Sequence, residues 1–348
     1  MTRLSARDLN RTLLHRQHLL ERTSMPVPAM VEHLVGLQAQ DSLPPYLSLA
    51  ARLTDLDPYA VSRRLEDRSL VRLLTMRGTI HLLVPDDALS LRSWTTPVQE
   101  RELKQSEGAR PALHLDREEL AAVVREVLVD PMPVGLLGET LAAHFPDVAP
   151  TNLAHVARLA QPLVQTPPRG CWKQPGGVVY ALVDRWLGRP EVDQVVEDLV
   201  RRYLRAYGPA TAADMTAWSG VTRLGPVLKV MDDLVVHEGP DGKPLFDVPD
   251  GEIVAGDRPA PVRLLGTYDN LWLAHAGRDR VTTAESRGRW MGRNGGTGHT
   301  VFVDGMMEGL WKVVDGRVEI TAQFRDLTRD EQHQLDEEIA RVDALLAR

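Results

Sequence analysis

The 348-residue sequence contains a single cysteine, Cys171, which excludes an internal disulfide and a cysteine-rich zinc cluster. No apolar run approaches the length needed to cross a bilayer, and no low-complexity linker interrupts the chain. We therefore expect a protein of the reducing cytoplasm, without a membrane partner, whose modules pack against one another.

Lysine is also scarce, since only five of the 41 basic residues are lysines and the other 36 are arginines. The planar guanidinium of arginine suits phosphates and base edges, but a GC-rich coding bias towards arginine and alanine explains the same split. The formal net charge of −7 opposes long-range attraction of a nucleic acid, so binding one would require local cations. Composition alone leaves the partner open.

Three segments of the chain repeat one plan, in which helices are followed by two apolar strands joined by a turn. In the first segment, strands flank Arg77-Gly78, and the expected helices cover 5–21, 29–38, 44–53 and 58–66. The second segment begins at the helix cap Asp116 and ends in "LVQTPPRGCWKQPGGVVYALV". The third contains the cap Thr211 and ends in a hairpin around Asp241-Gly242. This plan is typical of winged helix-turn-helix modules.

Beyond Gly251 the pattern changes to mixed strand and loop. Turns at Asp304-Gly305 and Asp315-Gly316 separate alternating apolar runs, which predicts a three-stranded antiparallel meander, and a closing amphipathic helix is expected over about 328–346. The predicted fold is therefore α+β, with three tandem winged helix-turn-helix modules and a C-terminal β-rich region that carries an Arg- and Gly-rich hairpin loop. The expected boundaries are 1–110, 111–188, 189–250 and 251–348.

The stretch "LVGLQAQDSLPP" places Gln38 and Gln40 where an apolar helix ends before two prolines. Residues two apart diverge on a helix but project to one side of an extended chain, so the pair can share a pocket only in extended or turn geometry. Glutamines in a loop are commonly surface or cap residues. An amide pair can nevertheless orient a water and donate to a sugar oxygen or a leaving group. That suffices for a substrate such as an N7-alkylated purine, whose positive charge already weakens its glycosidic bond.

Six motifs together resemble the AlkZ/YcaQ-type winged-helix DNA glycosylases, in the expected order over nearly the whole chain. They are "GLQAQD", "MRGTIHLL", "PPRGCW", "YGPATAADMTAWSG", "LLGTYDNLWLAHAGRDRV" and "VFVDGMMEGLW". The resemblance implies a cleft for DNA formed by three winged helices, with Gln38 and Gln40 as the catalytic Gln-x-Gln signature. The Gln-x-Gln branch of the family is associated with removal of bulky N7-alkylpurines, in repair or in self-resistance of antibiotic producers.

The expected function is thus that of a monofunctional DNA glycosylase acting on N7-alkylated purines. Its expected partner is double-stranded DNA that carries such adducts, and we expect a monomer in the cytoplasm, associated with the nucleoid, that needs no cofactor. The alternatives are a non-catalytic winged-helix transcriptional regulator and a damage sensor without turnover. Three unequal modules in one chain fit poorly with the symmetric dimers that read palindromic operators.

Candidate DNA contacts lie on the first hairpin, on the "PPRGCWKQPGG" loop and on a loop over 287–299 that we expect to insert near the lesion. On the hairpin, the arginine would meet a phosphate and the histidine would line the cleft, although such residues are commonly structural. The candidates are Arg77, Thr79, His81, Arg169, Trp172, Lys173, Arg287, Arg289, Arg293 and Asn294.

Four further residues, Ser42, Asp269, Asn270 and His275, are weaker candidates for lining the cleft. The spacing of Asp269, His275 and Asp279 does not match a compact zinc motif, so no metal is expected. The segment "GRNGGTG" lacks the strand context and terminal lysine of a phosphate-binding loop, so no nucleotide cofactor is expected either.

Overall fold

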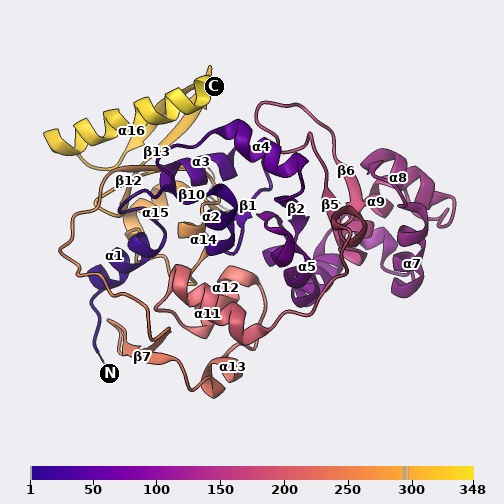
Figure 1. The fold of residues 1–348 in the computed structure, drawn as a ribbon, viewed down its shortest axis with the longest axis horizontal. Coiled ribbons are helices and arrows are strands. Elements are labelled where there is room, and N and C mark those ends of the chain that lie inside the picture. The colour runs from indigo at the N-terminus through magenta and orange to yellow at the C-terminus, as the bar shows by residue number, and fades with distance from the viewer. Residues whose placement is uncertain (1, 293–294, 297) are drawn as a thin grey trace.

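The computed structural model describes residues 2–292, 295–296 and 298–348, and the fold is mixed α+β (Figure 1). The first part of the chain alternates helices with three short strands. Its elements are α1 (Ala6–Arg16), α2 (Val27–His33), β1 (Leu37–Gln38), α3 (Pro44–Arg52), α4 (Pro58–Glu66), β2 (Val71–Leu74), the 3-10 turn η1 (Met76–Gly78), β3 (Ile80–Leu83), α5 (Pro85–Trp94) and α6 (Thr96–Gln105).

The helix expected over 29–38 is shorter than predicted and ends at His33. The chain then turns through Val35 and Gly36, which both have positive φ, and enters β1. The φ of 95° at Gly36 favours glycine, because other residues adopt this conformation only with strain. Because of this turn, Leu37 and Gln38 are extended, although the helix was predicted to continue to residue 38.

The second part of the chain contributes four α-helices, one 3-10 turn and three strands, and α7, α8 and α9 lie at the right-hand end of the molecule in Figure 1. Its elements are η2 (Arg110–Ala112), α7 (Arg117–Val127), β4 (Met132–Pro133), α8 (Val134–Ala142), α9 (Pro150–Ala160), β5 (Leu163–Gln165), β6 (Val179–Leu182) and α10 (Val183–Leu187). The predicted cap is confirmed, because the Asp116 side chain accepts from the Glu119 N–H.

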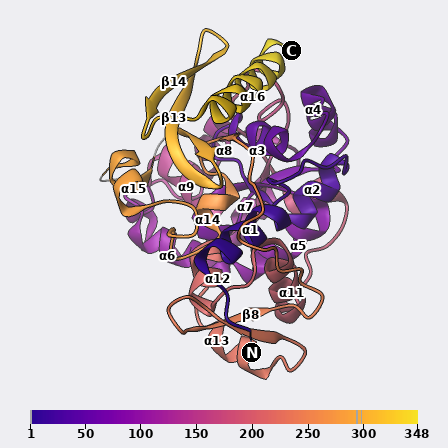
Figure 2. The same ribbon diagram turned by 90° about the vertical axis from the view of Figure 1, so that its left-hand side faces the viewer.

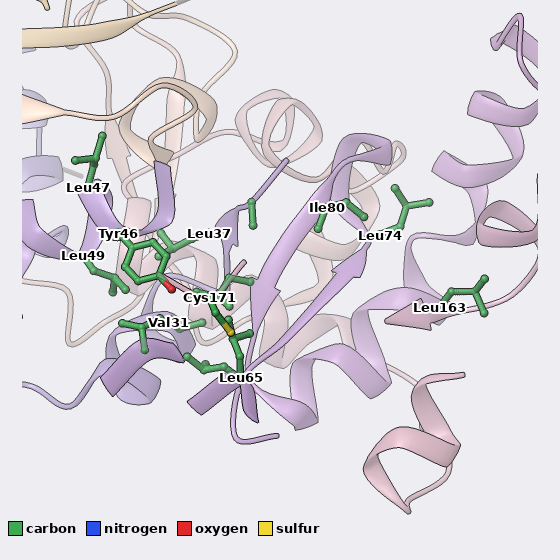
Figure 3. Packing of buried hydrophobic residues seen from close by; sticks show 14 of the residues in the cluster. Val31, Leu37, Tyr46, Leu47, Leu49, Leu65, Leu74, Ile80, Leu163 and Cys171 are labelled. Carbon is green, nitrogen blue, oxygen red and sulfur yellow. The ribbon is translucent and has the colours of Figure 1, made fainter. Parts of the chain in front are cut away.

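The strands of the first two parts form one antiparallel sheet of order β1-β3-β2-β5-β6-β4. The junction is the pairing of β2 with β5, where Arg72 lies opposite Gln165 and Leu73 opposite Val164. The two predicted hairpins therefore share one sheet. The glutamine segment, which pairs with β3 of the first hairpin, is thereby held in a fixed position relative to the second hairpin. Side chains of this sheet, among them Leu37, Leu74, Ile80 and Leu163, belong to one apolar core (Figure 3).

The third part packs as helices and one hairpin near the N-terminus (Figure 2). Its elements are α11 (Val196–Tyr207), α12 (Ala212–Ser219), α13 (Gly225–Val230), β7 (Val235–Glu238) and β8 (Pro244–Asp247). The capping box expected at Thr211 is confirmed with Asp214, and so is the hairpin at Asp241-Gly242. Tyr203, Tyr207 and Trp218 of this part are fully buried among one another and against α1.

The C-terminal part contains an antiparallel sheet of four strands instead of the three predicted. Its elements are β9 (Arg263–Leu265), α14 (Asn270–Leu273), α15 (Ala284–Trp290), β10 (Met291–Gly292), β11 (Gly295–Gly296), β12 (His299–Val303), β13 (Met306–Val314), β14 (Arg317–Gln323) and α16 (Arg329–Ala347). Both predicted turns, Asp304-Gly305 and Asp315-Gly316, have the positive φ at each residue that a tight hairpin requires. The additional strand β9 pairs with β12 and carries this sheet onto α3.

Buried ion pairs join the C-terminal and third parts to the first. Both Asp269 oxygens accept from the Arg52 guanidinium at 2.7 Å, and neither side chain is exposed. Arg16 makes a similar two-pronged contact with Asp247 at 2.7 and 2.8 Å. Within the described part of the chain, no helix is long and apolar enough to cross a membrane.

We expect Asp269→Asn to lower the free energy of unfolding by about 3–5 kcal/mol, because it leaves the Arg52 guanidinium buried without its counter-charge. Urea denaturation followed by circular dichroism measures the change. Asp241→Asn is the control, since Asp241 pairs with Lys243 at the surface and should leave the midpoint unchanged. An Asp269→Asn midpoint equal to that of the wild type would contradict the structural importance of the buried pair.

Candidate active site

The two glutamines lie on one face of the extended segment that begins with β1. In this strand Leu37 pairs with Leu82 and Gln38 with His81, and the ladder continues with the Ala39 N–H donating to the Ile80 carbonyl at 2.7 Å. Leu37 and Ala39 are buried in the core. Because side chains alternate along a strand, Gln38 and Gln40 share the opposite face.

The carbonyl oxygen of each glutamine accepts a hydrogen bond from the first hairpin. Arg77 Nη2 donates to Gln38 Oε1 at 2.9 Å, and the Ile80 N–H donates to Gln40 Oε1 at 3.2 Å. Gln38 is almost buried, with 7% of its surface exposed, whereas Gln40 is exposed. Among the described residues neither amide NH2 group has a protein acceptor, so both are available as donors.

Arg77 and His81 contact each other beside Gln38. Arg77 occupies a left-handed turn with φ of 54° and donates to the Trp218 carbonyl through Nη1 and to His81 Nε2, 3.1 Å away, through Nη2. His81 Nδ1 lies 3.0 Å from the Thr79 carbonyl, so the ring carries its hydrogen on Nδ1 and accepts at Nε2. Burial and the Arg77 charge lower the pKa of His81 to about 3, so His81 is a neutral acceptor near neutral pH.

Arg72 supports the glutamine segment from behind and was not identified from the sequence. Its guanidinium is buried and donates to the Ala39 carbonyl at 2.7 Å and to Gln165 Oε1 at 3.3 Å. Burial lowers its pKa to about 10, which still leaves it charged at neutral pH. Gly170 packs on this side chain, and a Cβ there would lie 2.5 Å from Arg72 Cδ. The signal in the sequence was an arginine inside the apolar strand "LVRLLT".

The third and C-terminal parts hold the turn that precedes β1. The Tyr207 hydroxyl donates to the Leu34 carbonyl at 2.6 Å, and Asn270 Nδ2 donates to the Gly36 carbonyl at 2.8 Å. Asn270 also contacts the Tyr207 hydroxyl at 2.7 Å and is 3% exposed. The expectation that Asn270 lines a cleft is therefore corrected: it braces the backbone behind the site.

Two other weak candidates are also core residues. Asp269 is held by Arg52 and by the Ser48 hydroxyl at 2.6 Å, which leaves it 1% exposed. His275 is 5% exposed and its Nε2 lies 3.0 Å from the Tyr207 carbonyl. Both expectations of cleft-lining positions are corrected, because these polar groups are buried and satisfied by the protein. Ser42 is half-buried two residues beyond Gln40 and stays a prediction.

The candidates on the second hairpin differ in exposure. Trp172 is 4% exposed and its ring packs on Tyr46 with centroids 4.8 Å apart, so the expectation that it contacts DNA is corrected. Arg169 is half-buried, with Nη1 3.3 Å from the Gly176 carbonyl. Lys173 is exposed and donates to the Leu346 carbonyl at 2.6 Å. Arg169 and Lys173 stay predictions as DNA contacts.

The segment expected to be a loop over 287–299 begins as helix α15. Within it, Arg287 pairs with Asp279 at 3.1 Å, and Arg289 pairs with Glu285 at 2.8 Å. These ion pairs neutralise part of the charge that the sequence offers for phosphates. Arg293 and Asn294 lie outside the described residues.

Among the described residues, the pocket at the third part is separate from the glutamines and no metal-binding group is formed. A cavity of about 590 Å³ lies between the third part and the segment 276–280, and neither glutamine lines it. Across the described ranges, no group of three or more His, Cys, Asp or Glu side chains is arranged to hold a metal ion. We therefore place the candidate site at the glutamine face.

The candidate site thus contains two amides, one held by the Arg77 guanidinium and the other by the Ile80 N–H, beside a neutral histidine. The sequence model of the family described as DNA glycosylase AlkZ-like matches residues 31–345, and the chain belongs to this family. A curated relative from Streptomyces sahachiroi, named an interstrand DNA cross-link repair glycosylase, is 29% identical over 94% of this chain and 93% of its own length. The solved structure of the Streptomyces sahachiroi DNA glycosylase AlkZ superposes with a TM-score of 0.84 at 25% identity, covering 100% of this chain and 98% of that one.

We expect His81 to remain the neutral Nδ1–H tautomer from about pH 5 to about pH 8. Its native pKa of about 3 is below the ordinary 6.5, so the folded protein binds fewer protons than the unfolded chain between these values. The stability gained from neutral His81 is complete above about pH 6.5 and is lost as the pH falls towards 3. Long-range ¹⁵N–¹H spectra, assigned through His81→Gln, measure the tautomer. A protonation midpoint near 6.5 would contradict the buried, arginine-facing geometry.

Proposed function

We propose that this protein is a monofunctional DNA glycosylase that hydrolyses the N-glycosidic bond of N7-alkylated, cationic purines. The observation that carries the proposal is the placement of Gln38 and Gln40 along one short extended segment, with their oxygens fixed and their NH2 groups without an acceptor among the described residues. Membership of the AlkZ-like DNA glycosylase family supports the reaction class.

In the proposed reaction a water attacks C1′ of the damaged nucleotide as the bond from C1′ to N9 breaks. The electron pair of that bond goes to the purine and neutralises its positive charge, and the water loses a proton to solvent. Each amide oxygen has two lone pairs and uses one towards the protein, so the second can accept from the attacking water. The NH2 groups can donate to oxygens of the sugar or to the departing base.

A mechanism that forms a covalent Schiff base has no amine in the segment that carries the glutamines. The stretch from Leu34 to Pro45 contains no lysine. Release of the free base, leaving an intact abasic strand, is therefore the expected product.

The relative from Streptomyces sahachiroi is named for the repair of interstrand cross-links. For this chain the proposed substrate class is N7-alkylated purines, which includes methyl groups, bulky adducts and cross-links. We propose a role in DNA repair or in self-resistance to a genotoxin. The organisation into three winged-helix modules with the boundaries given above, a monomeric state, and DNA contacts through Arg169, Lys173, Arg287 and Arg289 complete the proposal.

Duplex DNA that contains N7-methylguanine tests the function, with mild alkali to cleave the abasic product. We expect single-turnover release above the spontaneous rate, and a loss of about 100-fold or more for Gln38→Ala and for Gln40→Ala, because each removes a positioned dipole. Gln332→Ala, an exposed amide on α16, is the matched control and should retain full rate. A cross-linked duplex run in parallel determines which adduct is preferred.

No release from any N7-alkylated substrate would contradict the proposed function, and so would full activity of the Gln38→Ala, Gln40→Ala double variant. Protection of a defined sequence in undamaged DNA at nanomolar protein would instead favour a transcriptional regulator.

A further inference from the structure

Arg77 joins the first and third parts of the molecule at the glutamine face. It comes from the turn η1 of the first hairpin and donates to Gln38 Oε1, to His81 Nε2 and to the Trp218 carbonyl. Two of these acceptors belong to the first part of the chain and one to helix α12 of the third part. A single guanidinium therefore connects a candidate catalytic amide to a helix that is 180 residues away in the sequence.

The charge of Arg77 is balanced by a helix end. Among the described residues it forms no ion pair with a carboxylate. Its Nη1 instead meets the carbonyl of Trp218 in the last turn of α12, where the helix dipole is negative. Gly220 closes this helix in the left-handed conformation and packs on the Arg77 backbone, since a Cβ there would lie 3.3 Å from Arg77 Cα. The docking of α12 thus determines where the guanidinium lies.

The orientation of the Gln38 amide depends on this guanidinium. An amide can rotate by half a turn and exchange its oxygen for its NH2 group with little change in shape. With Arg77 present, the exchanged orientation would place the NH2 group against an N–H donor, and only the oxygen-inward orientation makes a hydrogen bond. Neutral His81 accepts a hydrogen bond at Nε2 from the same Arg77 Nη2, and this second contact holds the guanidinium in place.

We propose that Arg77 is a positioning residue of the glycosylase: it fixes Gln38 with its oxygen inward and its NH2 group towards the substrate, and it makes this orientation depend on the docked end of α12. The inference rests on the proposed function for its consequence in catalysis, but not for its geometry. Gln40 is the internal contrast, because the main-chain N–H of Ile80 holds its oxygen without any contribution from Arg77. Arg77 should therefore couple energetically to Gln38 and not to Gln40.

The chain offers a matched control in Arg101 of α6. Arg101 Nη2 donates to the carbonyl of Gly220, the residue that caps the same end of α12, but its side chain is exposed and makes no contact with either glutamine. Arg101→Met thus removes a cation from the same helix end while leaving the Gln38 amide untouched.

The kinetic experiment compares Arg77→Met, Arg77→Lys and Arg101→Met in single-turnover release of N7-methylguanine at saturating protein. We expect a loss of about 100-fold for Arg77→Met, since misplacing one group by about 1 Å has effects of this size. Arg77→Lys should recover only a small part, because an ammonium cannot reproduce the fork that reaches two acceptors through separate nitrogens. The release rate of Arg101→Met should differ from that of the wild type by less than about 3-fold. The dissociation constants of all three variants for DNA should also change by less than about 3-fold.

Double-variant cycles then test which glutamine Arg77 serves. The effects of Arg77→Met and Gln38→Ala should be strongly non-additive, whereas those of Arg77→Met and Gln40→Ala should multiply. Equal losses for Arg77→Met and Arg101→Met, or additivity with Gln38→Ala, would overturn the proposal, because the arginine would then act only through the packing of α12.

A readout without activity separates this inference from the proposed function. In protein labelled with ¹⁵N-glutamine, the side-chain NH2 signals of Gln38 and Gln40 are assigned through Gln38→Ala and Gln40→Ala. We expect Arg77→Lys, with thermal unfolding confirming that it is folded, to shift the Gln38 signals and leave those of Gln40 in place. Unchanged Gln38 signals would overturn the positioning role, whether or not the wild type releases N7-methylguanine.

Discussion

The register between β1 and β3 is the constraint on which the candidate site depends. A slip of one residue would turn Gln38 and Gln40 into the core and expose the apolar residues between and before them. A strand of two residues cannot fix its own register through ladder bonds alone. It is fixed from behind by Arg72, which binds the carbonyl between the two glutamines, and at its start by Tyr207 and Asn270, which bind the carbonyls of the preceding turn. Residues from three parts of the chain thus specify one short segment.

Buried and half-buried arginines provide much of this specification, in two different ways. Arg16 and Arg52 each face a carboxylate with both prongs of the guanidinium, and these pairs hold the parts of the chain together. Arg72 and Arg77 face carbonyl and amide oxygens instead, and they lie on either side of the glutamine segment. A guanidinium stays charged at a pKa of about 10, so burial does not neutralise it as it would a lysine. The excess of arginine over lysine, which suggested phosphate contacts, therefore also has a structural use.

The parts that could be predicted from the sequence are those with local causes. The caps Asp116 and Thr211 and the turns at Asp304-Gly305 and Asp315-Gly316 are confirmed, because each depends on residues within one turn of the chain. Strand β1 was not predicted, since its partner lies about forty residues further on and its two residues carry no periodicity. Asp269 and Trp172 are buried by contacts with residues that are distant in the sequence. These contacts could not be read from the local pattern, so both residues were interpreted as functional. The positive φ of Arg77 could not be read from the sequence, yet it directs the guanidinium towards Gln38.

The choice of neutral amides has a consequence for how the proposed enzyme would distinguish damaged from normal DNA. Departure of an N7-alkylated purine moves a positive charge from the base to the sugar, so the total charge in the site is unchanged and no proton donor is needed. An unmodified purine would have to leave as an anion or receive a proton, and the groups at the glutamine face supply none: both amides are neutral, and His81 carries its hydrogen on the nitrogen that faces Thr79. The Arg77 cation also strengthens the Gln38 NH2 as a donor by polarising the amide through its oxygen. Discrimination would then arise from the charge of the lesion itself, and the shape of the cleft would need only to admit the adduct.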